Sequence, residues 1–164
     1  MSKIRNPVIL TAIALVALVA SAAALSYLNA PGDVHFSVAP RHFTVGGKSF
    51  TITYLASTQS EWAQGLMDKK ITNVTFMLFA FPSLGNWQFY MYRTNSSLDM
   101  IWLNATESGG RVVYVYVGAP PCEDLTSVTC PRYTPASPGN YVIEAKAGFV
   151  HQNAITAGTF VEFG

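Results

Sequence analysis

One segment of the sequence, WQFYMYRTNSSLDMIWL at residues 87–103, constrains the fold most, because polar residues interrupt a run that is otherwise aromatic and apolar. Its two flanking stretches indicate β-strands. Arg93, Thr94 and Asp99 lie between or within them. Burying an unpaired polar or charged group costs several kcal/mol. These side chains are therefore expected on a solvated turn, or paired with each other or with a ligand.

The chain from residue 42 onward is predicted to be mostly β structure. Residues 42–45 and 48–55 alternate apolar and polar side chains around Gly46 and Gly47, and both glycines tolerate the positive φ of a tight hairpin. A second tight turn is expected at Gly109–Gly110. The same patterns predict further strands at residues 74–81, 87–92, 98–104, 111–118, 141–147 and 159–163.

One short helix is expected after the first hairpin. Thr58 and Glu61 have capping-box spacing, which is typical of a helix start. Trp62, Leu66 and Met67 follow as an apolar helix face. Strands at the predicted spacing are typical of a small β-barrel that is closed or partly open. The predicted fold class is therefore mostly β, a small β-barrel with one short helix.

An apolar run at the N-terminus is long enough to cross a membrane. Lys3 and Arg5 precede residues 8–28, which as a helix would span roughly 30 Å of hydrocarbon. By the positive-inside rule the basic residues stay in the cytoplasm, which predicts a single-pass protein of the cell membrane with its C-terminal domain outside. One alternative is a signal peptide with its core at residues 7–20, cleaved to release a secreted domain. Another is a pilin-type helix that packs into a filament.

The sequence thus divides into three expected parts. Residues 1–30 form an N-terminal membrane anchor or signal segment. Residues 31–41 are a linker or an added edge strand, and residues 42–164 form a single β-barrel domain. A domain of this length is near the usual size and can bury a substantial core.

The charge of the chain argues against a nucleic-acid partner. The formal net charge is +1, and charged residues make up 12% of the sequence. The sequence contains no run of Lys and Arg of the kind that binds phosphate. A neutral polar surface of this kind is common outside the cell.

Two cysteines, Cys122 and Cys130, lie in the loop APPCEDLTSVTCPRYTP. In an oxidising compartment they are expected to form a disulfide that stabilises the fold by about 2 to 3 kcal/mol. The three histidines, His35, His42 and His151, lack metal-ligand spacing to these cysteines, so no metal site is predicted.

Three asparagines fit the acceptor pattern for N-glycosylation. They are Asn73 in NVT, Asn95 in NSS and Asn104 in NAT. The pattern has meaning only on an exported chain, and it makes these three residues candidate glycosylation sites.

The order of several short motifs carries a resemblance to a known family. In sequence order these are GLM at residues 65–67, MLFAF at 77–81, FYMYRT at 89–94, LDMIWL at 98–103 and YVIEAKAG at 141–148. This series resembles the family called domain of unknown function 192, over roughly residues 42–164. The resemblance implies a small β-barrel with a short helix, often exported or membrane-anchored in prokaryotes, with no established activity.

The chain departs from the family pattern at several positions. Tyr90, Tyr92 and Arg93 occupy the positions of a Trp, a Lys and an Asn in that pattern. A function that depends on the Lys or the Asn is therefore in doubt for this chain. By contrast, Asp99 and Glu144 match the pattern, so a function that they carry could persist.

Five residues from these motifs are candidate ligand-binding residues: Arg93, Thr94, Asp99, Glu144 and Met91. Asp99 has a structural alternative, which is to accept backbone N–H bonds at a turn. Glu144 points either to solvent, by strand alternation, or inward to a partner. Arg93 is the natural partner for either carboxylate, and its guanidinium could also hold a carboxylate or sugar ligand. The surrounding side chains Met67, Met77, Phe79, Phe81, Phe89 and Met91 are expected in the core rather than in a cofactor pocket.

Three classes of function remain open. The sequence lacks nucleophile-elbow, phosphate-loop, zincin and haem-attachment motifs, so no cofactor is predicted. The first hypothesis is an extracytoplasmic binding or interaction module without catalysis, tethered by residues 8–28, with a carbohydrate or protein partner. The second is a structural subunit of a surface filament or membrane complex. The third is a carbohydrate-active hydrolase that uses Asp99 and Glu144 as acid and base.

Overall fold

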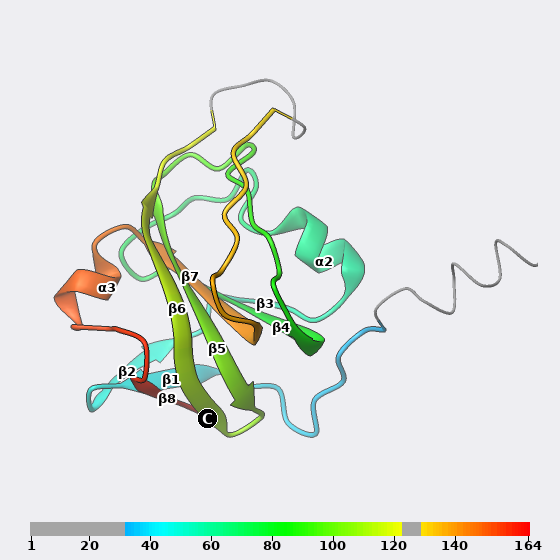
Figure 1. The fold of residues 1–164 in the computed structure, drawn as a ribbon, viewed down its shortest axis with the longest axis vertical. Helices are drawn as coiled ribbons and strands as arrows, with labels where there is room; N and C mark the ends of the chain where they lie inside the picture. The colour runs from blue at the N-terminus through cyan, green and yellow to red at the C-terminus, as the bar shows by residue number, and fades with distance from the viewer. Residues whose placement is uncertain (1–31, 123–128) are drawn as a thin grey trace, which may run out of the picture. The chain divides into compact units, whose positions relative to one another are not determined.

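The hairpin at Gly46 and Gly47 begins an eight-stranded sheet in the computed structural model of the chain, which describes residues 32–122 and 129–164 (Figure 1). Both glycines have positive φ, 57° and 75°, as the tight turn requires. The strands are β1 His42–Val45, β2 Lys48–Thr51, β3 Tyr54–Ala56, β4 Phe76–Gly85, β5 Leu98–Thr106, β6 Gly109–Ala119, β7 Gly139–Lys146 and β8 Phe160–Phe163. Their order across the sheet is β2-β1-β8-β6-β5-β7-β4-β3. The fold is therefore mostly β, as the sequence predicts.

The sheet is strongly curled, because its two edge strands are consecutive in the sequence. Only Ile52 and Thr53 separate β2 from β3, which lie at opposite ends of the strand order. The N–H of Ile52 donates to the carbonyl of Arg41, and that of Thr53 to the carbonyl of Phe76, each at 2.8 Å. No ladder joins β2 to β3 within the described chain. The predicted barrel is thus an open, curled half-barrel.

Each face of the sheet carries its own hydrophobic cluster. Helix α3, Phe149–Gln152, packs on the first cluster, and helix α2, Gln59–Gln64, packs through Trp62 on the second. Figure 1 shows the two helices on opposite sides of the strands. The first cluster includes Phe43, Phe76, Leu78, Ile101, Ile143, Ala145, Phe149 and Phe163. The second includes Leu66, Met77, Phe79, Phe81, Phe89, Met91, Met100, Trp102 and Val142.

Helix α2 begins where the capping-box pattern predicts. The Thr58 hydroxyl accepts a hydrogen bond from the N–H of Glu61 at 3.4 Å, and the Glu61 carboxylate accepts one from the N–H of Thr58 at 3.0 Å. The helix ends at Gly65, whose φ of 47° lies in the region that favours glycine. Leu66 and Met67, which were expected on the helix face, therefore follow the helix, and Leu66 packs in the second hydrophobic cluster.

Four local predictions are wrong. The single strand expected at residues 48–55 divides into β2 and β3, because the chain passes from one sheet edge to the other at Ile52. Residues 87–92 form isolated bridges rather than a strand. The turn expected at Gly109–Gly110 lies at the two preceding residues; a Cβ on Gly109 would lie 2.3 Å from the carbonyl oxygen of Val161, so this glycine permits close strand contact. Helix α3 was not expected.

The expected membrane segment lies outside the described residues. Residues 1–31 carry the whole apolar run, and nothing of their structure is described. Among the helices that the structure does describe, none has the length and hydropathy to span a bilayer. Residues 32–41 form no strand and lead into β1.

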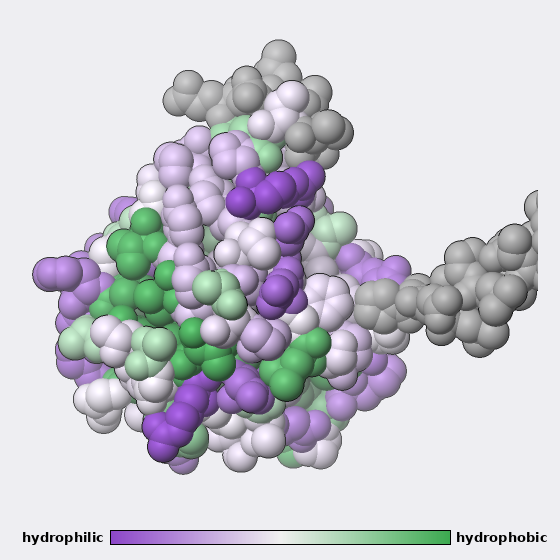
Figure 2. All heavy atoms as spheres, in the orientation of Figure 1, coloured by the Kyte–Doolittle hydropathy of each residue, from purple (hydrophilic) through white to green (hydrophobic). Residues whose placement is uncertain are grey.

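Apolar side chains reach the surface in several places. Figure 2 shows apolar residues gathered between α3 and β6 on the face toward the viewer. The large hydrophobic residues most exposed are Val38, Val74, Leu84, Val117 and Phe160. They come from separate parts of the chain, and single exposed apolar residues are normal in globular proteins. They do not by themselves identify a binding surface.

Candidate functional site

Asp99 is a structural residue at the centre of the sheet. Its side chain is fully buried, and its carboxylate accepts backbone N–H bonds from Gly118, Gly148 and Val150, each at 2.9 Å. These donors belong to the end of β6 and the start of α3. The carboxylate therefore connects β5 with β6 and α3. This gives a structural role to the LD pair at residues 98–99 and to the AG pair at residues 147–148.

Strand alternation separates Asp99 from Glu144. In the pairing of β5 with β7, Asp99 lies opposite Ala145, and Met100 lies opposite Glu144. Ala145 belongs to the first hydrophobic cluster, whereas Met100 belongs to the second, so the two carboxyls point to opposite faces of the sheet. A pair of carboxyls acting on one glycosidic bond must flank it on either side. Asp99 and Glu144 do not form such a pair.

Arg93 meets neither of these carboxyls. It forms a salt bridge with Asp68, and its Nε donates to Asp68 Oδ1 at 3.0 Å. Both side chains are more than half exposed, at 56% and 54%. Both residues also have positive φ, 52° for Arg93 and 58° for Asp68, so the ion pair joins two tight turns at the surface.

Glu144 instead lines a pocket of about 250 Å³ between α2, β4, β7 and the segment at residues 87–94. The walls of this pocket are mostly aromatic. Its lining comprises Trp62, Ala63, Gln64, Gly65, Leu66, Met67, Phe79, Phe81, Trp87, Gln88, Phe89, Tyr90, Thr94 and Glu144. Ligand sites are typically concave and apolar with a small number of polar groups, which is the composition found here.

Stacking and hydrogen bonds hold the aromatic walls in place. The rings of Phe81 and Trp87 stack with centroids 4.3 Å apart, and Trp62 lies 5.2 Å from Phe81. The indole N–H of Trp62 donates to the carbonyls of Ala56 and Ala80, at 3.2 and 2.9 Å. That of Trp87 donates to a carbonyl at 3.1 Å. The walls are thus set before any ligand enters.

The carboxyl of Glu144 is buried without a partner. Its side chain is only 4% exposed, and burial raises its pKa from the ordinary value of 4.5 to about 8. No hydrogen bond or ion pair from the described residues reaches it. Every fully buried polar side-chain atom in the described part of the chain has a partner, so the unpaired Glu144 oxygens must retain contact with the pocket. A buried acid of this kind is an unusual feature that calls for a functional explanation.

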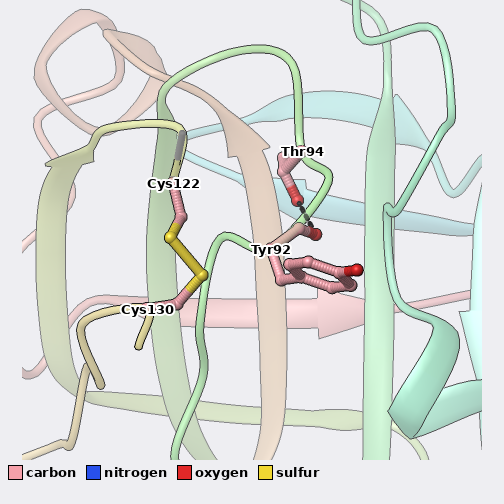
Figure 3. Close-up of a disulfide and its surroundings, with 4 residues drawn as sticks. All are labelled: Tyr92, Thr94, Cys122 and Cys130. Atoms are coloured by element: carbon pink, nitrogen blue, oxygen red, sulfur yellow. Dashed lines mark hydrogen bonds between the residues drawn. A yellow bond between two sulfur atoms is a disulfide. The ribbon is translucent and has the colours of Figure 1, made fainter. Parts of the chain in front are cut away.

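Thr94 is the other predicted site residue that lines the pocket. It is buried, and its hydroxyl donates to the carbonyl of Tyr92 at 3.4 Å (Figure 3). Met91 is buried in the second hydrophobic cluster and is not part of the lining. Of the five candidate ligand-binding residues, the structure brings together only Thr94 and Glu144.

The predicted disulfide between Cys122 and Cys130 is present, with Cα atoms 5.7 Å apart. It lies beside the chain that carries Tyr92 and Thr94 (Figure 3). The N–H of Cys122 donates to the carbonyl of Met91 at 3.2 Å. Phe89 and Tyr133 exchange two further backbone bonds, at 3.0 and 2.9 Å. Cys122 and Tyr133, on either side of the disulfide-bonded loop, therefore support the segment that forms one wall of the pocket.

Removal of the disulfide is expected to destabilise the domain moderately. Replacing Cys122 and Cys130 with serine should lower the free energy of unfolding by about 2 to 3 kcal/mol, because the short ring no longer restricts the unfolded chain. Urea unfolding followed by tryptophan fluorescence measures the change. Wild type under reducing conditions is the matched control and should reproduce the loss. Equal stability of the oxidised and reduced forms would contradict this role.

The glycosylation candidates have accessible side chains. Asn73, Asn95 and Asn104 are all exposed. Asn95 lies directly after Thr94, close to one wall of the pocket. Within the described residues, no three His, Cys, Asp or Glu side chains gather in a way that could hold a metal ion.

Sequence reasoning missed most of the pocket. Phe79, Phe81 and Phe89 were expected in the core, and they do belong to the second cluster, but they also line the pocket. Trp62 and Trp87 carried no functional expectation. The sequence carries no signal that connects them with Glu144, because these residues lie in separate segments of the chain. Their connection appears only when α2 is placed against β4.

Comparison with known proteins identifies the fold and not an activity. The model of the family DUF192, described as an uncharacterised ACR, matches residues 41–163. A candidate transcription regulator from Sinorhizobium meliloti is 24% identical, covers 79% of this chain and 98% of its own, and has a TM-score of 0.62. A protein of unknown function from Novosphingobium aromaticivorans is also 24% identical, covers 81% of this chain and 94% of its own, and has a TM-score of 0.60. No curated protein matches the chain.

Proposed function

The chain belongs to the DUF192 family of uncharacterised proteins, and we propose from its own geometry that it is a binding module that takes a small ligand into the aromatic pocket. The unpaired carboxyl of Glu144 is the observation that carries the proposal. A buried polar group without a partner destabilises the fold. A ligand that pairs with the group would offset this cost, and the pocket provides the space for one.

Binding without catalysis is favoured by the chemistry of the lining. Among the lining residues that the structure describes, Glu144 is the one carboxyl and Tyr90 is the one other ionisable side chain. Most acid–base mechanisms on a sugar or ester need a second positioned group or a nucleophile with its base. Aromatic rings with a single polar anchor suit recognition of a small molecule, including the ring face of a carbohydrate.

We further propose that the domain acts outside the cytoplasm. The apolar run at residues 8–28 after Lys3 and Arg5 would anchor it in the membrane, or would direct its secretion if it is cleaved. The disulfide supports export, because such bonds persist in oxidising compartments. The exposed Asn73 and Asn104 would be accessible to glycosylation there.

Truncating one aromatic wall tests the binding function. The probe is tert-butylbenzene, a small neutral ligand, followed by calorimetry and by NMR of the methyl groups of Leu66 and Met67, which both line the pocket. Trp87→Ala should weaken binding by roughly 5- to 10-fold, since one aromatic contact contributes about 1 kcal/mol. Phe160→Ala is the control, because Phe160 is exposed and is not part of the lining. It should bind as wild type does.

The pattern of methyl shifts decides the outcome. Shifts at Leu66 and Met67 without shifts at Met91, which is buried beside the pocket but not part of its lining, would place the probe in the pocket. If neither this probe nor a cationic one of the same shape moves the two lining methyls, the proposed function is wrong.

A further inference from the structure

The charge of the pocket selects among classes of ligand. Among its described lining residues none is Lys, Arg or His, and Glu144 is the one carboxyl. An anionic ligand would find no positive side chain in this lining and would meet a carboxyl that ionises to the same sign. A cationic ligand would meet a counter-ion. The choice is therefore between a cation and a neutral molecule.

Of the four acidic and basic groups on α2 and the turn after it, three have partners, and the fourth, that of Lys70, is exposed and is not part of the lining. Glu61 accepts the capping bonds of α2. Asp68 pairs with Arg93 at the surface. Lys69 places its ammonium 4.6 Å from the centroid of the Tyr54 ring. Glu144 therefore receives no cation from this side.

The strands around Glu144 also leave it without a counter-ion. Asp99 on β5 points to the other face and is satisfied by three backbone N–H groups. Lys146 lies two residues further along β7 and is exposed, with no ion pair to Glu144. Arg132 lies with its guanidinium 4.2 Å from the centroid of the Tyr90 ring and is not part of the lining. Strand β4 contributes only uncharged side chains.

The aromatic walls favour a cation for an independent reason. The face of an aromatic ring carries partial negative charge, and Trp, Tyr and Phe rings attract ammonium groups within about 6 Å, most strongly where water is excluded. Trp62, Phe81 and Trp87 form one contiguous group in the lining. Groups of aromatic rings recognise quaternary ammonium ligands, and here they line the same pocket as the Glu144 carboxyl.

We propose that the pocket binds an organic ammonium ion, with the Glu144 carboxylate as counter-ion and the rings of Trp62, Phe81 and Trp87 around the cation. This rests on the proposed binding function and specifies the class of its ligand. In the free protein at neutral pH the carboxyl is mostly protonated, so a bound cation displaces that proton to solvent. The competing possibility is a neutral ligand, whose affinity should fall or stay level as the carboxyl ionises.

Two probes of the same shape separate these possibilities. Phenyltrimethylammonium carries a cationic nitrogen where tert-butylbenzene carries a neutral carbon, so the pair differs in charge and little else. Calorimetry measures both dissociation constants between pH 6 and 9, in buffers of different ionisation enthalpy to count the protons released. Affinity for the cation should rise by roughly 50- to 100-fold over this range, because a group with a pKa near 8 is almost wholly protonated at the lower end. Affinity for the neutral probe should fall or stay level.

Matched variants assign the effect to one carboxyl. Glu144→Gln should remove the pH dependence and weaken binding of phenyltrimethylammonium at pH 9 by at least roughly 10-fold, a larger loss than for tert-butylbenzene. Asp68→Asn alters an exposed carboxylate outside the lining and should leave both probes unchanged.

The outcomes separate the two proposals. If tert-butylbenzene binds in the pocket and phenyltrimethylammonium binds no more tightly at pH 9 than at pH 6, the cation inference is overturned and the binding function stands. A pH dependence that persists in Glu144→Gln also overturns the inference. If neither probe binds, the binding function itself fails.

Discussion

Replacing Asp99 with alanine is expected to lower the free energy of unfolding by roughly 3 to 5 kcal/mol, since each buried hydrogen-bonding group left without its partner costs about 1 to 3 kcal/mol. Three backbone N–H groups, from Gly118, Gly148 and Val150, would lose their acceptor at a position that is fully buried. Urea unfolding followed by tryptophan fluorescence measures the loss.

The matched control is Asp68→Ala. Asp68 is also an Asp with a partner, but its salt bridge to Arg93 is more than half exposed, and pairs of this kind contribute about 0 to 1 kcal/mol. Asp99→Asn should fall between the two, because the amide keeps one acceptor oxygen and turns an N–H group toward the other donors. A loss for Asp99→Ala no larger than that for Asp68→Ala would show that the three bonds do not hold the fold.

The same variants test the separation of the two sheet faces. Asp99 lies on the face opposite the pocket, so Asp99→Asn, as far as it stays folded, should bind tert-butylbenzene with unchanged affinity. Weaker binding in the folded variant would mean that the two faces are coupled.

Alternation and turn chemistry allowed much of the fold to be predicted. The first hairpin and the start of α2 follow from local residues, namely two glycines of positive φ and a Thr–Glu capping pair. The curl of the sheet could not be predicted this way. It depends on the passage from β2 to β3 through Ile52 and Thr53, which joins the two edges, and no local pattern reports which edges a chain joins.

The site was harder to predict, because its polar residues are not neighbours in space. Asp99 and Glu144 resemble a pair of acidic motif residues in the sequence, yet adjacent strands turn them to opposite faces. Arg93 was expected beside one of them, and the positive φ at both ends of its pair with Asp68 directs it to the surface instead. The aromatic residues of the pocket also belong to a core cluster, and hydrophobicity alone does not separate core from pocket wall.

Glu144→Gln is expected to change the pH dependence of stability more than any other single substitution in the pocket. Burial raises the pKa of Glu144 from 4.5 to about 8, so between these values the folded protein holds a proton that the unfolded chain has released. The folded state therefore becomes less stable as pH rises through this window, and the effect levels off above pH 8. From this group alone, stability at pH 7 should be roughly 3 kcal/mol below that at pH 4. Glutamine does not titrate, so the variant should lack this decline.

The measurement is the difference in free energy of unfolding between Glu144→Gln and wild type at each pH, in which contributions common to both proteins cancel. This difference should grow with pH in favour of the variant and reach a plateau above pH 8, whereas Glu162→Gln, at an exposed position on β8, should follow wild type throughout. If this difference in free energy of unfolding does not change with pH, the Glu144 carboxyl ionises at no cost in the folded protein, and the inference that it lacks a partner is wrong.

Saturating phenyltrimethylammonium at pH 9 should reduce the difference in free energy of unfolding between the variant and wild type, because a ligand that pairs with the carboxylate stabilises only the folded wild type. The decline in stability and the affinity for a cation are thus two consequences of the same unpaired carboxyl, and they must disappear together in the glutamine variant.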